Sequence, residues 1–262
     1  MKDRIQKQIH KFKQNQFLFE ELVARDFKKR YVRTALGIVW SVLSPLLTLL
    51  IMRLVFTRFF GRNMVHYTTY LFCGTIIFTY FGDATREGMT TLFDNAPIFT
   101  KINVPKYLFL FSKNAQTLIN FLLILCVFFV FCLLDHITFT WRMLLLIYPI
   151  LCLVILNLGT GLVLSALYIF FRDIQYLWTV ALQLLQYLSA IFYQVESFPE
   201  NIQKLFYLNP IYLYIRYFRM IVLDLTVPSL AFHALMLGEA LVIFALGAYI
   251  YRKYNLEFLY YV

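Results

Sequence analysis

Long apolar segments alternate with short polar turns along most of this chain, and this alternation predicts a bundle of membrane-crossing helices. Each of six segments carries enough apolar residues to cross a ~30 Å hydrocarbon core as a helix. The predicted spans are residues 36–60, 67–90, 107–133, 142–170, 174–195 and 228–251. The predicted fold class is therefore an all-α integral membrane protein, organised as an N-terminal segment (1–35) and a six-span transmembrane domain (36–262).

Residues 1–35 predict an amphipathic helix lying along the membrane surface. Apolar side chains such as Phe12, Phe19 and Val23 recur at helical spacing, while lysines, arginines and glutamates occupy the remaining surface. The helix serves as a simple anchor or also contacts a cytoplasmic partner, and the sequence leaves both open. The segment has no continuous apolar core of a secretory signal, so we expect the spans themselves to direct insertion.

Basic residues predict the orientation of the bundle, because clusters of lysine and arginine prefer the cytoplasmic side. One cluster immediately precedes the first span, and Arg252 and Lys253 follow the last. Six crossings then leave both termini in the cytoplasm. The first cluster is Lys28, Lys29, Arg30 and Arg33.

Composition supports a polytopic membrane protein. The chain is 61% hydrophobic and only 15% charged, whereas a soluble domain is nearer half apolar and a quarter charged. We attribute the net charge of +10 to the orientation of the spans and to contact with anionic lipid, because no RNA-binding motif accompanies it. The four cysteines fall inside predicted spans without metal or redox spacing, so we expect them to pack as apolar residues.

The loop 91–106 between the second and third spans predicts a short helix. Asp94 or Asn95 is the expected cap, Pro97 occupies the first turn, and Pro105 ends the segment before the next span. A short, capped, amphipathic helix between two spans is suited to docking into a cleft of a partner.

Three charged residues interrupt the inner half of the second span. Asp83, Arg86 and Glu87 are spaced three and four apart, so they share one helix face and can pair with one another. Charges at this depth usually face a bundle interior or a wet cavity. A mutually neutralised structural cluster and the lining of a route through the bundle both remain open.

Residues 196–226 predict an external segment of two short re-entrant helices. Pro199 and Asn209-Pro210 interrupt this aromatic stretch, and Arg216 and Arg219 would destabilise a lipid-facing span. Treating 205–224 as a seventh span, which would place the C-terminus outside, is the main alternative.

In the fourth span, Gly159 and Gly161 provide small residues that favour close helix approach.

The sequence lacks motifs for chemistry of its own. It contains no phosphate-binding Gly-x-x-x-x-Gly-Lys loop, no Asp-x-Asp pair and no His-Glu-x-x-His motif. We therefore expect neither a cofactor nor a metal in this chain. A membrane-embedded glycosyltransferase would need acidic residues facing one cavity, and Asp83 and Glu87 are its only candidates.

Five short motifs, in order and together covering nearly the whole chain, resemble the permease subunit of type-2 ABC exporters of polysaccharide, O-antigen and teichoic acid. They are Arg25-Asp26-x-Lys28-x-Arg30-Tyr31, Leu36-Gly37-x-x-Trp40-x-x-x-x-Pro45-Leu46, Phe171-Arg172-Asp173, Phe198-Pro199 and Leu208-Asn209-Pro210. The resemblance implies a subunit of the bacterial cytoplasmic membrane that exports a polymer on a polyprenyl-diphosphate carrier. A lipid or drug exporter on the same scaffold is the alternative.

The resemblance also implies partners and site residues. Two permease copies, expected to form a homodimer, would face each other, and each would bind an ATPase subunit that holds ATP and magnesium. The helix in 91–106 would couple to the ATPase through Asp94, Asn95, Pro97, Lys101 and Pro105. The basic cluster before the first span would contact carrier phosphates at the entrance, although orientation alone also explains it.

Two further sets of residues are candidates for contact with a polymer, because sugar faces stack on aromatic rings. Tyr and Phe also accumulate at membrane interfaces in any family, so this assignment competes with a simple packing role. The candidates for the conduit lining are Asp83, Arg86, Glu87, Tyr187 and Tyr193. The candidates for the external gate are Phe198, Pro199, Tyr207, Asn209 and Pro210.

Overall fold

A computed structural model of the protein describes residues 2–31, 37, 39–60, 65–101 and 104–261. Over this part of the chain the backbone forms helices, 3-10 turns and loops without any β-strand, which confirms the all-α prediction. The α-helices are α1 (Lys2–Tyr31), α2 (Val39–Phe60), α3 (Tyr67–Asp94), α4 (Ala96–Phe99), α5 (Tyr107–Leu134), α6 (Ile147–Phe170), α7 (Ile174–Leu188), α8 (Glu200–Phe206), α9 (Pro210–Val222) and α10 (Leu230–Tyr254). The 3-10 turns are η1 (Trp141–Leu146), η2 (Val195–Ser197) and η3 (Glu257–Leu259).

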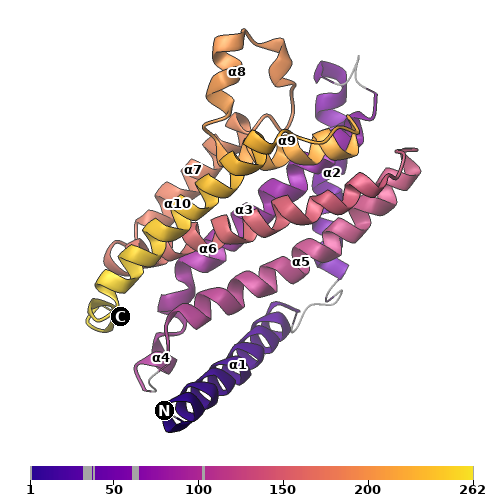
Figure 1. Ribbon diagram of the computed structural model, residues 1–262. Helices are drawn as coiled ribbons and strands as arrows, with labels where there is room; N and C mark the ends of the chain where they lie inside the picture. Colours follow the sequence, from indigo (N-terminus) through magenta and orange to yellow (C-terminus); the bar gives the residue numbers. More distant parts are fainter. Residues whose placement is uncertain (1, 32–36, 38, 61–64, 102–103, 262) are drawn as a thin grey trace.

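Helix α3 is the central element of the bundle. It packs against α2, α5, α6 and α9, and these neighbours surround it in the ribbon view (Figure 1). Its N-terminal half, residues 67–80, carries no charged side chain, which suits a helix enclosed by others. Leu71, Phe72 and Ile77 are accordingly inaccessible to solvent.

Helices α6 and α10 approach most closely at two glycines. A Cβ atom on Gly159 would lie 2.6 Å from the Cα atom of Phe244, and one on Gly247 would lie 2.5 Å from the carbonyl oxygen of Gly159. Since real Cβ atoms do not come so close to backbone, only glycine permits this packing. The predicted close approach at Gly159 is confirmed.

Among the described residues, four helical segments are long and apolar enough to cross a membrane. They are Val39–Thr57, Tyr107–Leu134, Trp141–Phe170 and Leu230–Tyr254, which correspond to the first, third, fourth and sixth predicted spans. Helix α3 carries several charged residues, and α7, with 15 residues, is about 22 Å long, short of a ~30 Å core. Length and composition thus support four of the six spans, and the count of six stays a prediction.

The predicted fifth span, 174–195, is wrong at its C-terminal end, because α7 stops at Leu188. Ala190 adopts a left-handed backbone with φ of 51°, which ends the helix. The carbonyl oxygens of Ala190 and Ile191 accept hydrogen bonds from Arg219, at 2.8 and 2.9 Å. The helix therefore ends where these carbonyl groups turn to accept hydrogen bonds from the buried side chain of Arg219.

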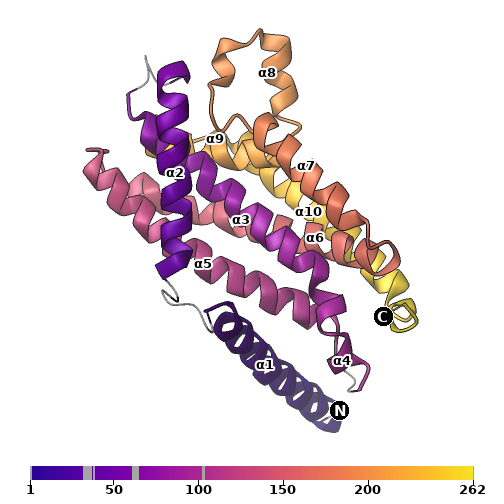
Figure 2. The same cartoon turned by 180° about the vertical axis from the view of Figure 1, so that it is seen from behind.

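Helix α1 lies alongside α5 at the end of the bundle that carries α4, as both ribbon views show (Figures 1 and 2). Leu22 of α1 is 4% exposed and joins an apolar cluster with Phe99 of α4 and Phe109 of α5. The predicted N-terminal helix is confirmed by Lys2–Tyr31, while the side chain of Phe12 lies outside the described residues. Its position at a membrane surface stays a prediction.

Candidate functional site

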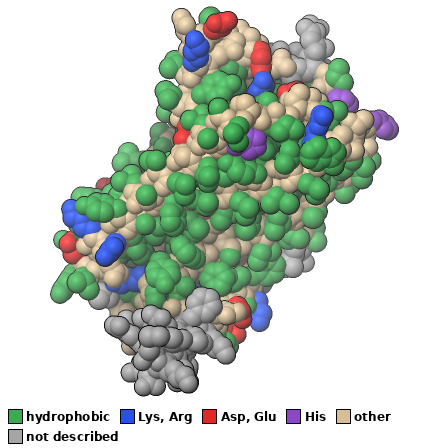
Figure 3. Space-filling view, viewed as in Figure 1, with side chains coloured by type: hydrophobic (Ala, Val, Ile, Leu, Met, Phe, Trp, Pro, Cys, Tyr) green, Lys and Arg blue, Asp and Glu red, His purple; other side chains and the backbone are tan. Residues whose placement is uncertain are grey.

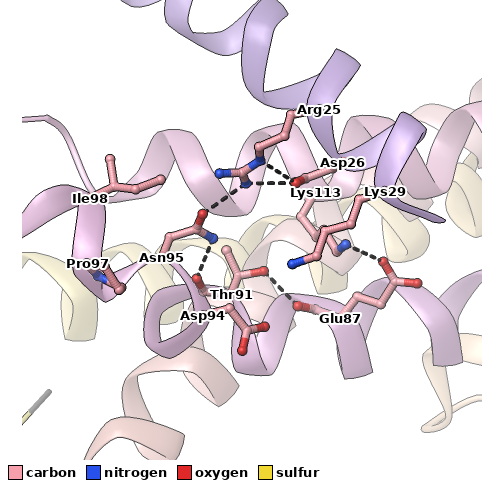
Figure 4. Close-up of a pocket in the computed structure, with 10 residues that line it drawn as sticks. All are labelled: Arg25, Asp26, Lys29, Glu87, Thr91, Asp94, Asn95, Pro97, Ile98 and Lys113. Carbon is pink, nitrogen blue, oxygen red and sulfur yellow. Dashed lines mark hydrogen bonds and ion pairs between the residues drawn. The ribbon is translucent and has the colours of Figure 1, made fainter. Parts of the chain in front are cut away.

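The candidate functional site lies where α1 meets the junction between α3 and α4. Arg25 of α1 donates a hydrogen bond of 2.9 Å from Nη2 to Oδ1 of Asn95. The same guanidinium group holds Oδ1 of Asp26, with Nη2 at 2.7 Å and Nε at 2.9 Å. Asp26 is buried, so its carboxylate fixes the arginine in place (Figure 4). Arg25 thus connects the N-terminal helix directly to the start of α4.

Asn95 occupies the N-cap position of α4, but the predicted capping hydrogen bond is wrong. Its Nδ2 atom instead donates to the carbonyl oxygen of Thr91 at 2.8 Å, and its Oδ1 atom accepts from Arg25. The side chain makes no capping bond because its oxygen and nitrogen atoms already bond to Arg25 and Thr91. Asp94 is still part of α3 and accepts a hydrogen bond from Thr90, so the second helix extends four residues beyond the predicted Thr90.

Helix α4 is a single turn with one face inserted into the protein and one face outside. Ala96 and Phe99 are buried, and the ring centroid of Phe99 lies 6.1 Å from that of Phe109. Pro97 is exposed, as is Lys101 just beyond the turn. A displacement of this turn would therefore be transmitted through Phe99 to α5.

A polar cavity of about 340 Å³ lies beside this junction, enclosed by α1, the end of α3, α4 and α5 (Figure 4). Across it, Glu87 of α3 forms an ion pair of 3.0 Å with Lys113 of α5. The sequence gives no signal for Lys113, because no pattern links it to Glu87, which lies twenty-six residues earlier on another helix. The described partner of Glu87 therefore lies on a different helix from Asp83 and Arg86.

Asp83 and Arg86 line other cavities, nearer the middle of the bundle. A cavity of about 260 Å³ between α2, α3 and α5 includes Asp83 together with Trp40, Ser44 and Asn120. A second, of about 170 Å³, includes both Asp83 and Arg86. This placement is compatible with the lining of a route through the bundle.

Lys106 anchors the C-terminal segment next to α4. Its ammonium group donates to the backbone carbonyl oxygen of Asn255 and lies 5.7 and 5.8 Å from the ring centroids of Phe99 and Phe258. Burial lowers the pKa of this ammonium group below its usual range. Pro105 directly precedes this lysine and α5, which agrees with its predicted role in ending the loop segment.

The predicted entrance residues are only partly described. Lys28 and Lys29 are exposed on α1, and Lys29 also lines the polar cavity. The side chain of Arg30 and all of Arg33 lie outside the described residues. Lys29 makes no ion pair with any residue in the described part of the chain.

The predicted external segment contains two short helices, α8 and α9, joined at Asn209 and Pro210. Asn209 caps α9, because its Oδ1 atom accepts from the backbone amide of Ile211 at 3.0 Å, and its Nδ2 atom donates to Ser189 Oγ at 3.0 Å. Pro210 takes the first helical position. The two-helix prediction is confirmed, and the insertion of these helices into the outer leaflet stays a prediction.

Aromatic rings link the predicted external segment to the stretch of chain just after α7. The ring of Tyr193 lies 5.6 Å from that of Phe198 and 6.2 Å from that of Phe206. Tyr207 packs edge-on to Tyr212 and Phe232, and Pro199 precedes α8. Tyr187 is 62% exposed on α7, so it faces away from the bundle.

Arg219 of α9 is a buried residue whose role the sequence did not reveal. It is 3% exposed, donates to the carbonyl oxygens of Ala190, Ile191 and Tyr70, and stacks 3.3 Å from the centroid of the Tyr70 ring. Backbone carbonyls carry no sequence signal, so this site could not be found from a pattern. Arg219 ties α9 to α3 and to the end of α7.

This helical bundle combines apolar helices long enough to cross a membrane with a short helix held against the N-terminal helix at one end. Residues 18–223 match the family model of the ABC-2 type transporter. That match covers more than half of the chain, and the chain belongs to this family. It is a permease subunit of the type-2 ABC exporter class, which confirms the resemblance found in the sequence.

Two relatives add detail. The chain is 26% identical over 204 residues to the O-antigen export system permease protein RfbA of Klebsiella pneumoniae, an alignment that covers 74% of this chain and 77% of the relative. It is 26% identical over 186 residues to the O-antigen export system permease protein RfbA of Myxococcus xanthus, covering 70% and 71%. Both alignments span most of each chain.

Proposed function

We propose that this chain is the membrane subunit of an ATP-driven exporter of a cell-surface polysaccharide. The observation that carries the proposal is the similarity, over about three quarters of both chains, to a permease named for O-antigen export. The polymer is carried on a polyprenyl diphosphate and crosses the bacterial cytoplasmic membrane outward. O-antigen, teichoic acid and related glycans belong to this substrate class.

The membrane arrangement that goes with this function has six crossings and cytoplasmic termini. Helices α3 and α7 supply the two crossings beyond the four long apolar helices. The short length of α7 is compatible with a crossing because α8 and α9 form an external layer above it. The basic residues near α1 and the end of α10 then face the cytoplasm, as the positive-inside rule requires.

A second copy of the chain completes the transporter in this proposal. Helix α2 exposes a row of large apolar side chains, among them Leu50, Ile51 and Leu54, which are 56 to 71% exposed. Helix α7 exposes Leu177 and Leu184 in the same way. A homodimer would bury part of these faces and enclose the polymer between the two copies.

Energy reaches the bundle through α4. A separate ATPase subunit binds ATP and magnesium, contacts the exposed Pro97 and Lys101, and moves α4 when it closes. The hydrogen bond from Arg25 to Asn95 transmits this movement to α1, and the contact of Phe99 with Phe109 transmits it to α5. The carrier phosphates enter beside Lys28 and Lys29, on the exposed surface of α1.

Depletion of this chain in its native cell tests the substrate class. The expected result is accumulation of a lipid-linked polymer that is accessible only from the cytoplasmic side, together with loss of the surface polymer. Normal surface glycans after depletion would refute polysaccharide export and favour a lipid or drug exporter on the same scaffold.

A further inference from the structure

A cavity of about 460 Å³ opens between α5, α6 and α10, at the end of the bundle near the C-terminus. It shares no lining residue with the polar cavity beside α1. Its walls are mainly apolar, formed by Phe111 of α5, Leu162 of α6, and Phe244 and Ala248 of α10. Of the predicted coupling residues, only Pro105 lines it.

Two cations lie at one end of this cavity. Lys106 is 8% exposed, and its ammonium group is bonded to Asn255 by the backbone carbonyl oxygen and by Oδ1, the latter at 3.3 Å. Arg252 lines the cavity from α10 and is exposed. Within the described part of the chain neither residue has a carboxylate within ion-pair distance. The apolar cavity thus ends beside two positive charges that form no ion pair within the described residues.

Tyr251 of α10 forms a buried part of the cavity wall. It is only 6% exposed, and its hydroxyl oxygen has almost no accessible surface. The apolar ring, rather than the hydroxyl group, therefore contributes to the binding surface.

The surface around the cavity indicates what kind of molecule this is. Hydrophobic side chains cover the face formed by α6 and α10, and lysine and arginine side chains gather at its end near the C-terminus (Figure 3). Leu241 of α10, about one helical turn before Phe244 and on the same helix face, is 47% exposed. An acyl chain can therefore continue from the cavity along this face.

We propose that this cavity binds an anionic phospholipid, with its phosphate between Lys106 and Arg252 and an acyl chain against Phe244 and Ala248. Basic pockets between transmembrane helices are suited to acidic lipid headgroups. The lipid stabilises the position of α10 relative to α5 and holds the C-terminal segment beside α4.

Native mass spectrometry of the full-length chain in detergent tests this site, with phosphatidylglycerol and phosphatidylcholine as probes. The wild type is expected to retain phosphatidylglycerol in preference to phosphatidylcholine. Arg252→Gln should weaken retention of phosphatidylglycerol about fivefold. Ala248→Phe, which fills the apolar end, should abolish it, and Ala248→Leu replaces that variant if it does not fold.

Lys253→Gln is the matched control, because it removes the same charge from the adjacent position. The Lys253 ammonium group lies 5.2 Å from the Tyr254 ring centroid, and the residue does not line the cavity. The control should retain phosphatidylglycerol like the wild type. Equal loss in Lys253→Gln and Arg252→Gln, equal retention of both lipids, or normal binding by both Ala248 variants would each overturn the proposal.

Discussion

Arg25 and Asn95 are seventy residues apart in the sequence, and a hydrogen bond of 2.9 Å joins their side chains. One lies on the N-terminal helix and the other at the start of the turn that we propose to contact the ATPase. The amide of Asn95 is held on its other side by the carbonyl oxygen of Thr91, so it cannot rotate without losing both bonds. This asparagine therefore connects three elements, α1, α3 and α4.

Replacing Asn95 by alanine should uncouple ATP hydrolysis from export. A hydrogen bond to a charged group contributes about 1.5–3 kcal/mol, so losing it should reduce export per ATP hydrolysed by about tenfold or more. ATP hydrolysis itself should persist, because the ATPase retains its own site. Surface polymer and ATPase activity measured together distinguish these effects.

Gln16→Ala is the control for that variant. Gln16 donates a hydrogen bond of 3.0 Å to Glu20 on the same exposed face of α1, so its removal does not affect α4. Export should remain normal. Equal export loss in both variants would contradict the assigned role of Asn95.

Replacing residues 94–101 by a flexible Gly/Ser linker tests the coupling segment as a whole. Insertion into the membrane should be unchanged, because the spans on both sides are intact. Export should be lost while the ATPase continues to hydrolyse ATP. Export at the wild-type rate, with the chain present at its normal level, would refute the coupling role of α4.

Gly159→Ala should destabilise the pair formed by α6 and α10. The new methyl group would lie 2.6 Å from the backbone of Phe244, and such overpacking costs about 1–3 kcal/mol. The melting temperature of the purified protein should fall. The corresponding change at Gly238, where a Cβ atom meets nothing within 4 Å, should leave it unchanged or raise it slightly. Similar melting temperatures for the two variants would contradict the close packing.

Arg219→Met should destabilise the external segment much more than Arg216→Gln. The methionine leaves the carbonyl oxygens of Ala190, Ile191 and Tyr70 without their donor, which costs about 3 kcal/mol or more. Arg216 forms a partly exposed ion pair with Glu196, and such pairs contribute about 1 kcal/mol or less. Denaturation of both variants in detergent measures the difference, and equal stability would be inconsistent with a structural role for Arg219.

The sequence predicted those features that depend on local pattern. Apolar length predicted the long helices, and the asparagine-proline pair at 209–210 predicted the boundary between α8 and α9. Glycine spacing predicted the close approach at Gly159, since a backbone contact requires no particular partner side chain. Each of these signals lies within a few neighbouring residues, so it can be recognised without knowing which helices pack together.

The sequence could not predict interactions that depend on which helices become neighbours. The residue preferences of helix N-caps predicted that the Asn95 side chain would bond to the backbone of α4. In the structure its amide instead bonds to Arg25 and to the carbonyl oxygen of Thr91. Glu87 pairs with Lys113 across two helices. The early end of α7 follows from carbonyl groups that turn toward Arg219, and no residue pattern marks such acceptors.

Transport in proteoliposomes that contain this chain and its ATPase tests the central claim most directly. The measurement is ATP-dependent transfer of a labelled, polyprenyl-diphosphate-linked glycan across the vesicle membrane. The account predicts transfer that requires ATP and both subunits, and that the Asn95→Ala variant strongly reduces at an equal rate of ATP hydrolysis. Transfer without ATP, or ATP hydrolysis that never moves the glycan in wild-type vesicles, would contradict it.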